Sequence, residues 1–137
     1  MLINSKKEKM KYTRKVIDYF MHPKNRGSIS NADGIGTVTN PVCGDKTTVY
    51  IKVEKKRGKD YIKDIKFETL GCAAAIASSS IATELIRGKS LEQAKKLKKE
   101  MIIKKLGGLP QQKIHCSLLA TDALFEAIKN YEEKQAD

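Results

Sequence analysis

The hydrophobic pattern of the first half of the chain changes from a helical period to a strand period. After a polar beginning, apolar residues recur at helical spacing at Tyr12, Val16, Tyr19 and Phe20. This spacing predicts a short amphipathic helix that Pro23 and Gly27 end. A first strand is predicted over residues 34–39. Apolar and polar residues alternate over 47–69 around a turn at 57–59, which predicts a β-hairpin.

The second half of the chain has a helical period. Residues 73–87 are rich in alanine and predict a helix that ends at Gly88. Ser90 and Gln93 have the spacing of a capping box at the start of the next helix. Further helical segments are predicted over 91–99, 101–106 and 117–131. Because the strands precede most of the helices, the order predicts an α+β fold in which helices cover one face of a small antiparallel sheet.

The length and composition restrict the class of protein. The 137 residues suit a single domain over residues 12–137, preceded by a flexible basic tail over residues 1–11. No apolar run approaches the ~18 residues that a bilayer requires. The first residues have neither a secretory nor a transit pattern. We therefore expect a soluble cytoplasmic protein with no membrane partner.

The strong positive charge does not by itself indicate a nucleic-acid partner. The chain has 27 basic and 16 acidic residues, a formal net charge of +11. Only four of the basic residues are arginines, and no basic stretch is rich in aromatic residues. Proteins that bind nucleic acids use arginine for base edges and aromatic rings for stacking. Nucleic-acid binding is therefore the least favoured alternative, and solubility, thermal adaptation or docking to an acidic partner explains the lysines better.

Three cysteines, Cys43, Cys72 and Cys116, lie at predicted boundaries between elements. An odd number with no close pair, in a reducing compartment, favours metal ligation or thiol chemistry over disulfides. Asp45 lies two residues after Cys43, and His115 directly precedes Cys116. Together these five residues predict a soft-metal site. Their spacing matches no C-x-x-C zinc motif, and each cysteine taken alone could be a small core residue.

Several segments in the same order resemble a known family, the IscU/NifU-type iron–sulfur cluster assembly scaffolds. The likeness extends from Tyr12 to about Tyr131. It rests on the motifs HPKNRG at 22–27, PVCGD at 41–45, TLGCAAAIASSS at 69–80, GKSLEQA at 88–94 and KIHCS at 113–117. The resemblance implies a three-stranded antiparallel sheet with helices packed on one face, the IscU/SufE-like fold.

The resemblance implies an assembly scaffold and cluster carrier rather than an enzyme. Such a protein receives sulfur from a cysteine desulfurase, combines it with iron and electrons from donors into a labile 2Fe–2S cluster, and passes the cluster to acceptor apoproteins. By motif match, Cys43, Cys72 and Cys116 are cluster ligands, and Cys116 accepts the sulfur. Asp45 or His115 supplies the fourth position. A carboxylate or an imidazole binds iron–sulfur units less firmly than a thiolate, so this position is expected to make the cluster labile.

Two features precede the last cysteine in the sequence, one that concerns its thiolate and one that concerns a chaperone partner. Lys113 is close enough in sequence to influence the Cys116 thiolate, although a surface role is equally compatible with its position. The segment LPQQK at 109–113 departs from the LPPVK motif of family members that an Hsp70-type chaperone serves, so this chaperone is not expected as a partner.

The main alternative is a zinc-bound sulfurtransferase of the SufU-like branch, in which zinc takes its ligands from Asp45, Cys72, His115 and Cys116 while Cys43 is left free to accept sulfur. Members of that branch have an insertion between their last two cysteines and lack the histidine before the final one. This chain has His115 and no such insertion, which favours the scaffold. A scaffold without its cluster can also hold zinc. Whether the cluster lies within one subunit or between the two subunits of a homodimer stays open.

Overall fold

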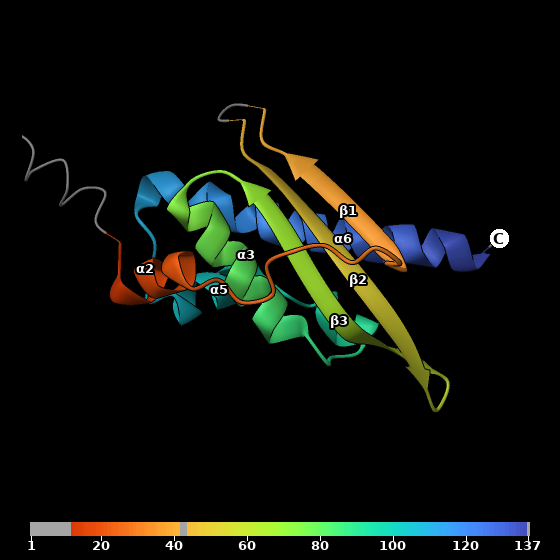
Figure 1. The fold of residues 1–137 in the computed structure, drawn as a ribbon. Helices are drawn as coiled ribbons and strands as arrows, with labels where there is room; N and C mark the ends of the chain where they lie inside the picture. The colour runs from red at the N-terminus through yellow and green to blue at the C-terminus, as the bar shows by residue number, and fades with distance from the viewer. Residues whose placement is uncertain (1–11, 42–43, 137) are drawn as a thin grey trace, which may run out of the picture.

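The structure, a computed structural model, describes residues 12–41 and 44–136 (Figure 1). The first elements are helix α2 (Arg14–Met21) and strands β1 (Gly34–Thr39), β2 (Lys46–Lys56) and β3 (Lys59–Leu70). They are followed by helices α3 (Ala73–Ile86), α4 (Leu91–Ala94) and α5 (Lys99–Lys105), the 3₁₀ turn η1 (Gln111–Lys113) and helix α6 (Ile114–Ala136). None of the helices in the described ranges combines the length and the apolar character needed to cross a membrane.

The strands form one antiparallel sheet of three strands in the order β1-β2-β3. Helix α6 packs on β1 and β2, and α3 packs on β3, so the helices lie on one face of the sheet (Figure 1). The predicted α+β fold is therefore confirmed. The hairpin between β2 and β3 is confirmed as well, with positive φ angles of 53° at Arg57 and 81° at Gly58, the geometry of a two-residue turn that matches strand twist.

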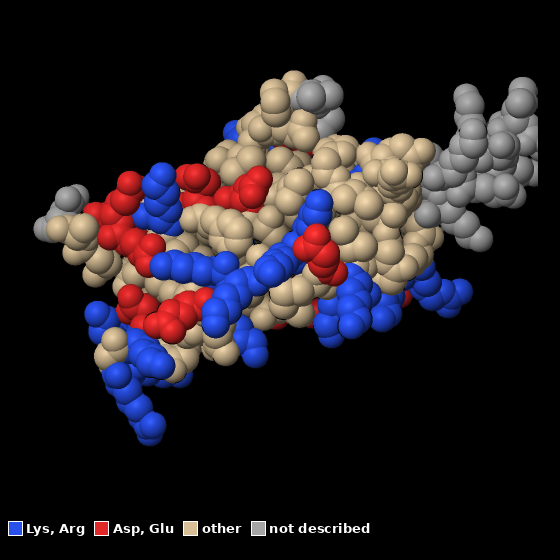
Figure 2. All heavy atoms as spheres, turned by 180° about the vertical axis from the view of Figure 1, so that it is seen from behind, with Lys and Arg blue, Asp and Glu red and all other residues tan. Residues whose placement is uncertain are grey.

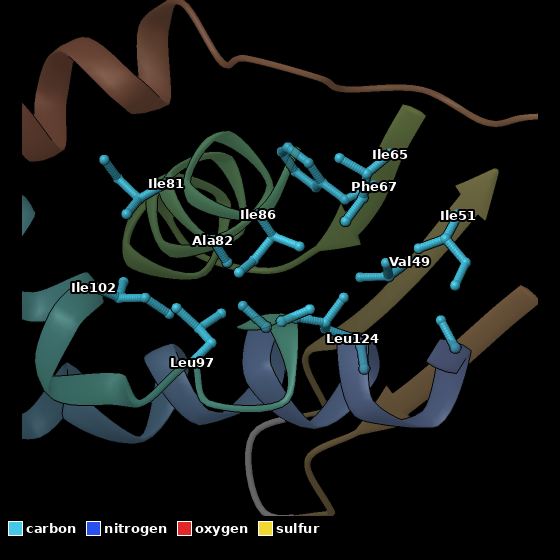
Figure 3. Packing of buried hydrophobic residues seen from close by; sticks show 14 of the residues in the cluster. Val49, Ile51, Ile65, Phe67, Ile81, Ala82, Ile86, Leu97, Ile102 and Leu124 are labelled. Carbon is cyan, nitrogen blue, oxygen red and sulfur yellow. The ribbon is translucent and has the colours of Figure 1, made fainter. Parts of the chain in front are cut away.

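The core lies between the sheet and helices α3 and α6. Its strand residues are the inward-facing side chains of Val49, Ile51, Ile65 and Phe67. They face the layer that holds Ile86 of α3 and Leu124 of α6 (Figure 3). Eleven of the 14 residues of α3 are buried. This degree of burial is expected of a helix that neighbours enclose on nearly all sides.

Two glycines let β1 lie in backbone contact with α6. A Cβ added to Gly36 would lie 2.3 Å from the carbonyl oxygen of Ala123 and equally close to the backbone nitrogen of Ala127. A Cβ added to Gly34 would lie 2.3 Å from the carbonyl oxygen of Ala127. The absence of side chains at these positions therefore sets the distance between sheet and helix. It also fixes the position along the sheet of α6, the helix that contains Cys116.

Replacing Gly36 by alanine is expected to destabilise the protein by about 1–3 kcal/mol or more, because the new methyl group cannot fit without moving α6. Thermal unfolding followed by circular dichroism measures the change. Ile35→Ala is the matched control, since the Ile35 side chain is 44% exposed and points away from α6. Equal melting temperatures for Gly36→Ala and the parent chain would contradict this account of the contact.

The helix predicted over 91–99 is shorter than expected. The capping box of Ser90 and Gln93 is confirmed, but α4 ends at Ala94 and α5 begins at Lys99. The intervening turn carries Leu97 into the core, where it is 3% exposed, while the lysines around it remain at the surface. Burial of one apolar side chain and repulsion among neighbouring lysines thus outweigh helical spacing.

The last helix begins earlier than predicted, at Ile114 instead of residue 117. The turn η1 follows Pro110 and leads directly into α6. Cys116 therefore lies in the first helical turn and is 1% exposed. The expectation that all three cysteines lie on loop ends is wrong for Cys116, because tertiary packing extends the helix backward over a segment without a helical apolar stripe.

Candidate functional site

Three of the predicted site residues converge at one end of the sheet. Asp45 directly precedes β2, Cys72 is the N-cap of α3 just after β3, and Cys116 lies in the first turn of α6. One ligand atom from each of these residues lies within 4.8 Å of the other two. Asp45 and Cys72 are half-buried and Cys116 is buried. Residues far apart in the sequence thus form one group of two thiols and a carboxylate.

Gly71 allows the carboxylate of Asp45 to approach the thiols. A Cβ added to Gly71 would lie 2.8 Å from Cγ of Asp45, 2.9 Å from Oδ2 of the same residue and 3.2 Å from Cβ of Ala75. No side chain other than hydrogen leaves room for this arrangement. The glycine before Cys72 is therefore a packing requirement of the site as well as part of a turn.

The sulfur atoms of Cys72 and Cys116 are 3.5 Å apart, and both thiols are free. The hydrogen bond from the Cys116 thiol lowers the pKa of Cys72 to about 6, despite the opposing effect of burial. Backbone N–H groups of Ala75 and Ala74 and the charge of Lys113 contribute in the same direction. The contact with Cys72, together with burial, raises the pKa of Cys116. At neutral pH the pair therefore shares one proton and carries one negative charge.

Two further side chains surround the thiol pair. The charge of Cys72 is the main factor that raises the pKa of Lys113, and Cys116 and Asp45 act in the same direction. Burial, followed by the charge of Cys72, raises the pKa of Tyr12. Tyr12 also packs against the small buried cluster that contains Cys116. The site thus has a cationic neighbour that favours thiolate and an aromatic neighbour that excludes water from one side.

The two other predicted site residues are His115 and Cys43. The Nε2 atom of His115 is 3.7 Å from Sγ of Cys116. His115 is half-buried and borders the group, but it is not among the three donors that lie within 4.8 Å of one another. Cys43 lies outside the described residues. Its predicted part in the site remains a prediction.

A chain of buried hydroxyl groups links the structural elements that carry the site. Oγ1 of Thr47 lies 3.2 Å from Oγ1 of Thr69, which in turn lies 3.2 Å from Oγ of Ser79. The Ser79 hydroxyl donates to the carbonyl oxygen of Ala75 at 2.9 Å. These bonds connect the start of β2, the end of β3 and helix α3. They therefore hold Asp45 and Cys72 at a fixed separation.

The two thiols of the described site are expected to differ in their reaction with iodoacetamide. Since only the thiolate reacts and the pKa of Cys72 is lowered, its alkylation rate should reach half its maximum near pH 6 and stay high above it. Cys116 should stay unreactive over the same range. Peptide mass spectrometry after timed quenching reports each cysteine separately. Cys116→Ala removes the donor and should return the midpoint of Cys72 toward about 8.5; an unchanged midpoint would contradict the shared proton.

Sequence reasoning named the three residues that the structure brings together but missed two of their neighbours. The sequence predicts Tyr12 only as the first apolar position of a helix, and it assigns Gly71 no role at the site. Neither role has a local signal, because both depend on segments that are distant in the sequence. Of the two roles that the sequence left open for Lys113, its charge takes the one at the thiols, and its effect reaches both Cys72 and Cys116.

The fold is a small α+β domain with helices on one face of a three-stranded antiparallel sheet. At the end of this sheet it holds two thiols and a carboxylate, so it presents soft and hard donors together. The family described as the NifU-like N terminal domain matches residues 11–137. The chain belongs to this family.

Relatives with curated names have high identity to this chain. The iron–sulfur cluster assembly scaffold protein IscU 1 of Archaeoglobus fulgidus is 56% identical over 123 residues, which is 90% of this chain and 78% of that protein. The scaffold protein IscU of Aquifex aeolicus is 45% identical over 124 residues, 90% of this chain and 78% of that protein. The Haemophilus influenzae IscU is 46% identical over 129 residues, 92% of this chain and 99% of that protein.

Two solved structures share the fold. One, from Fervidobacterium islandicum, is described as a candidate iron–sulfur cluster assembly scaffold for the SUF system; it is 29% identical, with a TM-score of 0.72 over 85% of this chain and 96% of that chain. The other is the N-terminal part of a NifU-like protein from Brucella abortus, 23% identical, with a TM-score of 0.65 over 93% of this chain and 97% of that chain. The second likeness concerns the fold alone.

Proposed function

We propose that this protein is a scaffold on which a labile 2Fe–2S cluster is assembled and from which it is passed to acceptor apoproteins. The convergence of Asp45, Cys72 and Cys116 within 4.8 Å is the observation that carries the proposal. The names of the relatives support the same function. The cluster is cargo here, so the site must both bind it and release it.

The chemistry of the donors suits temporary binding. Thiolates are the ligands that iron–sulfur clusters prefer, whereas a carboxylate is a harder donor that iron–sulfur units bind less firmly. Cys72 and Cys116 would hold the cluster together with Cys43, and Asp45 or His115 would supply the exchangeable position. The half-buried position of Asp45 leaves this donor within reach of an incoming thiolate from an acceptor.

Cys116 is proposed as the group that accepts sulfur from a persulfide of a cysteine desulfurase. In this step the Cys116 thiolate attacks the outer sulfur of the persulfide, a new S–S bond forms, and the desulfurase cysteine leaves as a thiolate. Because Cys116 holds the shared proton in the free protein, that proton must first pass to Sγ of Cys72, 3.5 Å away, and Cys116 becomes a nucleophile only after this transfer. The charge of Lys113 stabilises the negative charge on the thiol pair throughout.

The proposed partners follow from this chemistry. A cysteine desulfurase supplies sulfur, an iron donor and an electron donor supply the remaining components, and apoproteins with free cysteines receive the product. A zinc-bound sulfur relay is the second candidate, because two thiols and a carboxylate within 4.8 Å also suit a tetrahedral zinc ion. The relay would accept sulfur without building a cluster.

Anaerobic incubation with ferrous iron, cysteine and a desulfurase separates the two functions. The scaffold is expected to develop the visible charge-transfer absorption of a 2Fe–2S centre that stays with the protein through gel filtration. Formation of a protein persulfide, detected by mass spectrometry, without any such absorption would contradict the scaffold and support the relay.

Gly71→Ala is expected to weaken metal binding by about 10–100-fold, the range typical when a group that orients a ligand is lost. The added methyl group would displace the carboxylate of Asp45 while both thiols remain. Zinc titration of the protein by competition with a chromophoric chelator measures the affinity. Leu70→Ala is the matched control, because Leu70 precedes Gly71 and its side chain is 73% exposed. Equal affinities for both variants would place Asp45 outside the metal site.

A further inference from the structure

The two edges of the sheet differ in how they are covered. The chain runs beside β3 at both ends of that strand. Gly27 donates its backbone N–H to the carbonyl oxygen of Phe67 at 2.8 Å, and Ile62 donates to the carbonyl oxygen of Lys89 at 2.8 Å. In the described part of the chain, no segment pairs with the outer edge of β1, which forms the open side of the sheet in Figure 1.

The backbone of β1 directs two N–H groups to this open edge. Ile35 donates its N–H to Oδ1 of Asn130 on α6 at 3.0 Å, so this group points away from β2. Since successive N–H groups of a strand point to opposite sides, those of Thr37 and Thr39 also point outward. Both threonines are exposed. The strand has no charged residue and no proline, the features with which proteins usually protect such an edge.

Helix α6 runs antiparallel to β1 and places acidic side chains along the open edge. Gly34 lies against Ala127 and Tyr131, whereas Gly36 lies against Ala123 and Ala127. Two residues of a strand advance about 6.6 Å and four residues of a helix about 6 Å. Because Asn130 is level with Ile35, Glu126 is level with Thr37 and Asp122 with Thr39.

The two carboxylates are available for a partner. Both are exposed, and none of the ion pairs among residues 12–41 and 44–136 includes Asp122 or Glu126, although the chain has 27 basic residues. Burial and the charge of Glu126 raise the pKa of Asp122, as expected when two carboxylates are close together. On the face seen in Figure 2, acidic side chains gather toward the left, and basic side chains lie between them and along the lower edge.

We propose that the open edge of β1 binds an extended, lysine- or arginine-bearing segment of a partner protein, which adds to the sheet as a further strand. The N–H groups of Thr37 and Thr39 bind its backbone, and Asp122 and Glu126 bind its basic side chains. Because β1 ends at Thr39 and the next residue, Asn40, donates its backbone N–H to the carbonyl oxygen of Asp45 at 2.8 Å, a partner held there lies beside the candidate site. The docking itself does not depend on the proposed function.

Two ten-residue peptides test this docking, one alternating threonine with lysine and the other alternating threonine with glutamate. Amide hydrogen exchange measured by NMR should show slower exchange at Thr37 and Thr39 with the lysine peptide. The glutamate peptide should bind at least about tenfold more weakly. Thr37→Pro removes one outward N–H at a position where an edge strand tolerates proline, and should weaken binding by about tenfold, whereas Thr37→Ala should not.

Further outcomes decide against the proposal. Equal binding of both peptides, or binding of the lysine peptide without slower exchange at Thr37 and Thr39, would overturn it. A dimer detected by sedimentation, with these amides already protected in the absence of peptide, would replace the partner segment by a second copy of the chain. If Thr37→Pro does not fold, the reversal Asp122→Lys with Glu126→Lys must abolish the preference for the lysine peptide.

Discussion

Replacing Cys72 by serine is expected to abolish cluster assembly while the fold remains. The serine hydroxyl fits the space of the thiol and can cap α3, but it is a poor ligand for iron–sulfur units at neutral pH. It also removes the thiolate partner of Cys116 at 3.5 Å. The visible absorption formed in anaerobic reconstitution should fall by more than about 10–100-fold. A metal site loses roughly that much affinity when a residue that only orients one of its ligands is removed, and here a ligand itself is lost. Cys116→Ser should have the same effect.

Two controls separate loss of a ligand from loss of structure. Leu70→Ser introduces a hydroxyl two residues before Cys72 on a side chain that is 73% exposed, and it should assemble the cluster like the parent chain. Circular dichroism and thermal unfolding should show that Cys72→Ser is folded. A folded Cys72→Ser protein with full cluster yield would exclude Cys72 as a ligand.

Replacing Asp45 by alanine is expected to slow the release of the cluster. The carboxylate is the hard donor among the described ligands and the easiest for an acceptor thiolate to displace. Without it, His115, whose Nε2 atom is 3.7 Å from Sγ of Cys116, can supply a firmer nitrogen ligand. Transfer to an apo-ferredoxin, followed by visible circular dichroism, should slow by about tenfold, equivalent to about 1.4 kcal/mol in the barrier.

A second variant at position 45 tests whether the strength of this ligand sets the rate of cluster release. Asp45→Cys offers a fourth thiolate and should retain the cluster even longer than Asp45→Ala. Asp18→Ala removes an exposed carboxylate on α2 and should leave the transfer rate unchanged. Equal or faster transfer from Asp45→Ala would refute the idea that this carboxylate makes the cluster labile.

The sequence allowed the elements and the donors to be predicted, because their signals are local. Strand alternation located the hairpin, and the change to helical spacing after Gly71 located α3 with Cys72 at its N-terminus. The resemblance to the scaffold family added the three-stranded sheet. Candidate ligands could be named because two of the three cysteines lie within two residues of Asp45 or His115, and these residue types are chemically distinctive wherever they fall in the chain.

The remaining features depend on contacts between distant segments. Nothing near Gly71 in the sequence indicates that the side chain of Asp45 approaches to within 2.8 Å of where a Cβ on Gly71 would lie. The break at Leu97 arises from burial, which local spacing does not encode. Likewise, the proton shared by Cys72 and Cys116 depends on the packing of α3 against α6, so the sequence alone gave no reason to assign the lower pKa to Cys72.

The transfer of a doubly labelled cluster tests the scaffold function most directly. The cluster is assembled with iron-57 and with sulfur-35 from labelled cysteine, and the loaded protein is then mixed with an apo-ferredoxin in the presence of an iron chelator. The account predicts that both labels reach the ferredoxin together, in the ratio of an intact 2Fe–2S cluster. Labels that stay with this protein, or sulfur that moves while iron goes to the chelator, would contradict it.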